Sequence, residues 1–202
     1  MTETHATPAP RRGRKLKAVL AAGLVLGAGA AVTLAAWNDS EFARGTFTAG
    51  TFNLVGSIDG TTYTDHATVG SPATLGFTVN AATLSPGAVT AAPFAVELAA
   101  NTTNPAVVTI SSAATTGTVT NLTYELMQTA TFGCTASTTG TDLVPAGTAL
   151  STVPGSTTFP LTQGTGGAAG APVFLCFKVT GGAGLAQGQT GTATWQFQAA
   201  SQ

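Results

Sequence analysis

Positive charge is scarce in this sequence once its first seventeen residues are set aside. Five of the seven Lys and Arg residues lie between positions 11 and 17, which leaves only Arg44 and Lys178 downstream. From Trp37 onward, two basic residues stand against seven acidic ones, a formal net charge of −5. Such a chain cannot neutralise a phosphate backbone, so we expect no nucleic-acid partner. Its weakly charged surface also provides little repulsion between copies, which favours self-association.

Histidine is equally scarce, since His66 is the only one after residue 36. Hydrolases usually use histidine as a base or as a metal ligand. The sequence also lacks the paired histidines of a zinc protease, a Gly-rich phosphate loop and a nucleophile elbow. We therefore predict that the protein is not an enzyme and has no catalytic residues, no metal and no cofactor.

Residues 59–66 form an oxygen-rich stretch, whose side chains could surround a cation if the loop folded back on itself. Its carboxylates are too few and too irregularly spaced for a calcium loop. We favour a turn between two strands.

The amino terminus carries an export signal. A basic cluster precedes Ala18–Ala36, a run of 19 residues without charge, which is the pattern of a secretory signal helix. Small residues end this run, so residues 1–36 are predicted to be a signal peptide cut between Ala36 and Trp37. The alternative is an uncleaved anchor, because 19 apolar residues can just span a bilayer. The abundance of Gly and Ala in this run favours cleavage. After cleavage, only the precursor would be associated with the membrane, and the product would be secreted, extracellular or at the cell surface.

Two cysteines, Cys134 and Cys176, lie in the exported part. An oxidising compartment makes a disulfide between them the first expectation. Such a bond would stabilise the fold by roughly 4 kcal/mol on the chain-entropy model. A metal site or a catalytic thiol is the alternative, but both require histidine partners.

Short runs of alternating apolar and polar residues follow one another between Gly, Pro, Ser and Asn, with no helical periodicity. The alternation predicts half-buried strands around 75–79, 94–98, 108–110, 122–126, 173–179 and 193–199. We predict an all-β fold, a single β-sandwich of jelly-roll type over residues 55–202. A Thr/Gly-rich stretch near 135–170 is expected to be an insertion.

The junction after the apolar run carries the most specific motif: Ala35-Ala36-Trp37-Asn38-Asp39-Ser40, followed by the segment Gly45–Leu54. It resembles the TasA/camelysin family of Gram-positive biofilm matrix proteins, whose precursors are cut by a SipW-type signal peptidase just before an aromatic residue. The turn Leu84-Ser85-Pro86-Gly87 and the segments 94–98 and 101–110 resemble a second element of that family. The resemblance covers roughly residues 34–110, and the cysteines and the Thr/Gly-rich stretch depart from it.

The resemblance implies a jelly-roll subunit of a matrix fibre that polymerises by donor-strand complementation. Its donor strand would be the arm 37–54, with Phe42, Phe47, Phe52 and Leu54 filling successive pockets of the next copy. The implied partners are copies of itself, other matrix proteins and, during export, the SipW-type peptidase. The alternation changes phase around Ala49-Gly50, which indicates a bulge or hinge. Alternatively, these residues form an ordinary first strand of their own sheet.

Two other functions stay open. An all-β sandwich could be a cell-surface binding module or adhesin, with Tyr63, Tyr124 or Trp195 as contacts if exposed. Trp195 is in phase with Ala193 and Phe197, which favours core packing instead. A camelysin-like metalloprotease is the second possibility, and the missing histidine pair argues against it.

Overall fold

The computed structural model describes residues 17–20, 41–77 and 84–202. The predicted cleavage residues Ala36 and Trp37 lie outside these ranges, and of the predicted signal helix only residues 17–20 are described, as helix. Within the described ranges, no helix is long and apolar enough to cross a membrane. Thr48–Gln202 forms one compact unit and the chain up to Phe47 another.

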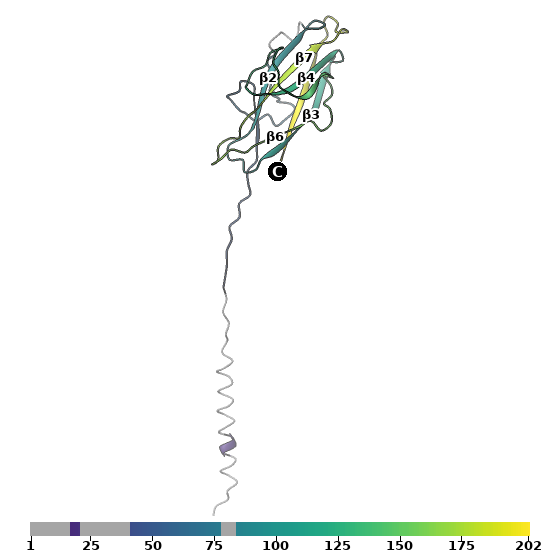
Figure 1. Cartoon of the computed structure of the whole chain (residues 1–202). Helices are drawn as coiled ribbons and strands as arrows, with labels where there is room; N and C mark the ends of the chain where they lie inside the picture. The colour runs from purple at the N-terminus through teal and green to yellow at the C-terminus, as the bar shows by residue number, and fades with distance from the viewer. Residues whose placement is uncertain (1–16, 21–40, 78–83) are drawn as a thin grey trace, which may run out of the picture. The chain divides into compact units, whose positions relative to one another are not determined.

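The compact unit Thr48–Gln202 consists of strands and connecting turns (Figure 1). Its strands are β1 (Leu54–Ser57), β2 (Val89–Leu98), β3 (Ala106–Gly117), β4 (Leu122–Thr129), β5 (Thr141–Ala149), β6 (Thr158–Leu161), β7 (Val173–Gly181) and β8 (Gly191–Ser201). Five of the six predicted strand regions fall within β2, β3, β4, β7 and β8.

The strands form two antiparallel sheets. One has five strands in the order β1-β2-β7-β4-β5, and the other has three in the order β6-β3-β8. Their apolar side chains share one core, so the prediction of an all-β sandwich-like fold is confirmed. The jelly-roll connectivity stays a prediction.

The core lies between the inner faces of the two sheets and follows the alternation of the sequence. On the five-stranded sheet, Phe94, Leu126 and Phe177 are buried, and on the three-stranded sheet Val108 is. Phe177 connects the two sheets, since its ring centroid is 4.7 Å from that of Trp195 on β8. Aromatic pairs at this separation add to the stabilisation from burial.

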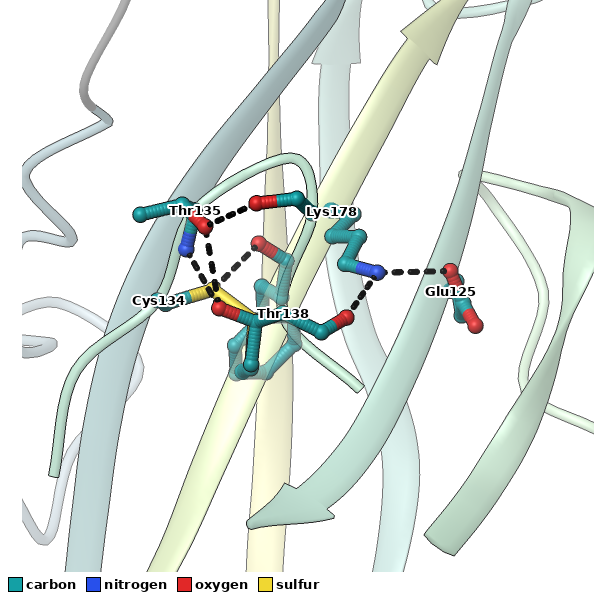
Figure 2. A network of polar contacts seen from close by, with 8 residues as sticks. Glu125, Cys134, Thr135, Thr138 and Lys178 are labelled. Atoms are coloured by element: carbon teal, nitrogen blue, oxygen red, sulfur yellow. Dashed lines mark hydrogen bonds and ion pairs between the residues drawn. A yellow bond between two sulfur atoms is a disulfide. The ribbon is translucent and has the colours of Figure 1, made fainter. Parts of the chain in front are cut away.

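The outer face of the five-stranded sheet is covered by the loop that precedes β5. The predicted disulfide is confirmed: Cys134 of this loop is bonded to Cys176 of β7, with the two Cα atoms 5.2 Å apart. Next to it, the Lys178 ammonium donates to the Thr138 carbonyl oxygen at 2.5 Å and lies 3.6 Å from the Glu125 carboxylate (Figure 2). A buried disulfide of this kind is typical of an oxidising, extracellular environment.

The Thr/Gly-rich stretch expected as an insertion contributes to both sheets. Its β5 is an edge strand of the five-stranded sheet, and its β6 is an edge strand of the three-stranded one. Strands so rich in Thr, Gly and Pro carry weak sequence signals, because few of their side chains are large and apolar.

The strand expected around 75–79 is not formed over residues 75–77, and Val79 lies outside the described residues. Leu75 and Phe77 nonetheless pack against the core, while Gly76 between them is exposed. The alternation was therefore a correct indicator of burial but not of strand pairing.

Candidate functional site

The sheet edges differ in how well they are protected against pairing with another chain. β5 carries Asp142 and Pro145, β6 carries Pro160, and β1 has only 4 residues. Proline, charge and short length all discourage edge pairing. β8 has 11 residues, and none of them is charged or proline. Among the described strands it pairs only with β3, so its other edge is open.

The direction of the β8 amides follows from the hydrogen bonds around it. Gln202, just after β8, donates its N–H to the Pro105 carbonyl oxygen at 2.9 Å, on the side of β3. Along an antiparallel strand, successive N–H groups point to alternate sides. The amides of Ser201, Ala199 and Phe197 therefore point to the open edge, where they could donate hydrogen bonds to a further strand.

A groove of about 1650 Å³ lies along this open edge, inside the unit Thr48–Gln202. Its wall comes from both sheets and from the segments that precede β2 and β8. The principal apolar residues of its wall are Phe94, Val96, Leu122, Phe177, Trp195 and Phe197. Among the described residues that line it, only Asp65 and His66 have acidic or basic side chains. The groove thus fits an apolar, extended occupant better than a charged one.

Trp195 lies in the wall of the groove and packs against two other aromatic rings. Its ring packs 5.4 Å from Tyr124 and 4.7 Å from Phe177, measured between centroids. Its Nε1 is buried and makes no hydrogen bond of normal geometry among the described residues. Burial raises the pKa of Tyr124, but the Trp195 side chain partly offsets this rise, so the two polar groups interact. The Tyr124 hydroxyl itself donates to the Thr152 carbonyl oxygen at 2.9 Å.

The four predicted donor residues fall into two groups. Phe42 and Phe47, in the segment up to Phe47, are 93% and 95% exposed. Leu54 belongs to β1 and packs against the core of its own domain, and Phe52 is 40% exposed. The two most exposed aromatic rings of the described arm thus lie in its first part, and Phe52 is exposed to a smaller extent.

The chain becomes attached to its own domain at Gly50 and Thr51. Thr51 forms a parallel bridge with Thr102, and its carbonyl oxygen accepts the Thr103 N–H at 3.0 Å. Its hydroxyl donates to the Asn101 carbonyl oxygen. A Cβ on Gly50 would collide with the Thr103 side chain, so this close approach requires glycine. Attachment begins where the sequence indicated a bulge or hinge.

The oxygen-rich stretch 59–66 forms a turn. The Asp59 carboxylate accepts the N–H groups of Thr62 and Thr61 at 2.7 and 2.8 Å, and the Ser57 hydroxyl at 2.8 Å. These bonds, first of all that from Thr62, hold the Asp59 pKa well below its usual range. The carboxylate thus already serves as a turn cap. Over the described residues, no three His, Cys, Asp or Glu side chains gather as a metal site would require.

Comparison with known proteins supplies no relative: no protein-family model matches the chain, and no curated protein is significantly similar to it.

The open edge of β8 is the site feature that the sequence analysis missed. The sequence did hold a signal for it, namely an alternating strand without charge or proline, in contrast to the prolines of β5 and β6. Composition alone does not reveal which strand is an edge, because that depends on neighbours far away in the sequence.

Proposed function

We propose that this chain is a secreted structural subunit of an extracellular or biofilm-matrix fibre. In this proposal, the exposed arm of one copy pairs with the open edge of β8 in the next copy and fills its groove. The observation that carries the proposal is the coexistence, in one chain, of an uncharged strand edge without a described partner strand and an arm with two exposed aromatic residues, Phe42 and Phe47.

The dimensions of arm and edge support this pairing. Residues 37–47 number eleven, the length of β8. Added beside β8, they would turn the three-stranded sheet into a four-stranded one facing the five-stranded sheet. The amides of Phe197 and Ala199 would gain acceptors, and main-chain bonds of this kind provide the affinity in strand addition.

The aromatic residues of the arm match the chemistry of the groove. Phe42 and Phe47 are five residues apart, so a regular strand would place them on opposite faces. Gly45 between them permits a bulge that directs both rings into the groove. Phe52 and Leu54 then remain with their own domain and connect the two copies.

A surface-binding module is the alternative, and the aromatic residues proposed for it give it little support. Trp195 and Tyr124 pack against the core, and Tyr63 is half-buried with its hydroxyl unpaired among the described residues. None of the three presents an open aromatic face for a sugar ring.

A matched pair of lysine substitutions on β8 tests the proposal. Ala199 faces the groove and packs against the core, whereas its neighbour Ala200 is exposed on the opposite face. In purified protein starting at Trp37, A199K places a charge where the arm would insert, while A200K leaves the groove unchanged. We expect A199K to reduce fibre formation at least about a hundredfold, and A200K to change it less than about twofold.

Electron microscopy and sedimentation measure the fibres, and circular dichroism verifies that both variants are folded. The variant F42S/F47S is expected to lose assembly like A199K without a change in melting temperature, because both rings are exposed. Equal assembly by A199K and A200K, or normal assembly by F42S/F47S, would contradict strand donation.

A further inference from the structure

The groove beside β8 is bordered by a segment of its own domain. Residues 72–77, which we term the strap, contribute Ala73, Leu75 and Phe77 to the partly buried side chains packed against the core. Thr74 and Gly76 are exposed, so the side chains alternate as they do in a strand. The strap residues other than Gly76 also line the groove.

The strap packs against the core beside the groove through side chains alone. It has no strand assignment, and within the described part of the chain no main-chain hydrogen bond joins residues 72–77 to β8 or to any other strand. Its apolar side chains are only half-buried, in contrast to fully buried core residues such as Phe177 and Leu126. It therefore contributes burial, but none of the described residues accepts a hydrogen bond from the β8 amides at the open edge.

We propose that the strap competes with an incoming arm for the groove beside β8. It keeps the groove of the free subunit closed until an arm displaces it. This inference rests on the proposed strand donation and names the device that regulates it. In this proposal the apolar side chains of the strap cover core surface that the arm side chains would contact, so both cannot be fully seated. The arm also forms a ladder of main-chain hydrogen bonds with β8, so it displaces the strap at equilibrium.

The strap therefore slows assembly without preventing it. A groove left open after export would expose apolar surface and a bare strand edge, which together promote disordered aggregation. The strap covers part of that surface during the time when subunits are still dilute. Its displacement from a subunit already in contact with an arm adds a step to each addition.

The test compares assembly rates of the full exported chain carrying different alanine substitutions. L75A/F77A removes the two largest strap side chains from the groove, and we expect it to shorten the lag of assembly about tenfold. I58A is the matched control, because Ile58 is 50% exposed and lies outside the groove lining. It is expected to assemble at the wild-type rate.

A wild-type measurement guards against misfolding of the double variant. Chymotrypsin cleavage after Leu75 or Phe77, located by mass spectrometry, is expected to be faster in assembled than in free subunits, because the arm has displaced the strap. Assembly of L75A/F77A at or below the wild-type rate would overturn the strap as competitor, as would cleavage that is unchanged or slower on assembly. In either case the strand donation would stand if wild-type protein forms fibres. Wild-type protein that stays monomeric would refute both.

Discussion

The two sheets of this protein differ in how well their edge strands are protected against pairing with a further strand. In the five-stranded sheet, β1 is short, β5 carries proline and charge, and the outer face is fastened by the disulfide. In the three-stranded sheet, β6 is protected by Pro160, but β8 is long, uncharged and open. The comparison indicates that the five-stranded sheet supplies stability and the three-stranded sheet is left available for a further strand.

The largest effect is expected from the disulfide. The variant C134A/C176A should lower the free energy of unfolding by about 4 kcal/mol, since the bond closes a loop with a sequence separation of 42 residues. Urea denaturation measures the loss, and wild-type protein unfolded under reducing conditions should match it. Folded variant protein should still assemble, because Cys176 faces away from the groove. A loss below about 1 kcal/mol would show that the five-stranded sheet does not depend on the bond.

The next effect concerns Tyr124 of β4, whose hydroxyl donates to Thr152. Y124F should lower the free energy of unfolding by about 1 kcal/mol, because it removes this hydrogen bond and leaves the Thr152 carbonyl oxygen unpaired.

The same residue predicts a pH dependence. Burial raises the pKa of Tyr124, so on raising the pH the unfolded chain loses this proton before the folded one does. Stability should therefore fall as the pH rises above about 10, and less steeply in Y124F. Urea denaturation at two alkaline pH values tests this, and equal slopes for Y124F and wild type would contradict it.

A smaller effect is expected at the protected edge of the three-stranded sheet. Pro160 stands opposite Val107 in the pairing of β6 with β3. P160T should give β6 an additional amide and raise edge-to-edge aggregation several-fold, as measured by light scattering. P154T, in the turn before β6, is the matched control and should behave as wild type. If P160T aggregates no faster than P154T, Pro160 is not the reason why the edge of β6 is better protected against pairing than the edge of β8.

The smallest effect concerns Glu97 on β2, next to the short edge strand β1. Burial raises its pKa, so the folded state favours the protonated form. Its contribution to stability is complete below the usual glutamate pKa and is lost as the pH rises through the raised one. E97Q should therefore stabilise the protein at pH about 7 by less than about 0.5 kcal/mol, and not at pH about 4. Denaturation at both values tests this, and a stabilisation that is equal at the two would contradict it.

The sequence predicted β2, β3, β4, β7 and β8 well, because alternation reports burial directly. Phe94, Tyr124 and Phe177 are all buried as their phase required. The disulfide followed from the number of cysteines and the export signal. The strands β5 and β6 were missed, because Pro145 and Pro160 within them interrupt the pattern that marks a strand.

The candidate site was harder to predict for a different reason. The donor arm was predicted from the resemblance that begins at the junction after residue 36, and its role stays a prediction; the structure adds that Phe42 and Phe47 are exposed. The proposed acceptor of the arm could not be predicted, because the open edge of β8 arises from pairing with β3, about 85 positions earlier in the chain, as the contact of Ser111 with Gln196 shows. The strap misled for a related reason, since its alternation reflects burial against the groove and not strand pairing.

The position of the disulfide also determines how this chain would respond to tension. A pull applied at the amino-terminal arm and resisted at β8 runs along the covalent chain and enters the loop between Cys134 and Cys176. The S–S bond offers a direct route across that loop, so the 42-residue separation, about 140 Å of extended chain, carries no load. β5 and β6 lie within this bypassed length. These two strands, one edge strand of each sheet, would therefore bear no load. The subunit cannot be extended to its full contour length while the S–S bond is intact.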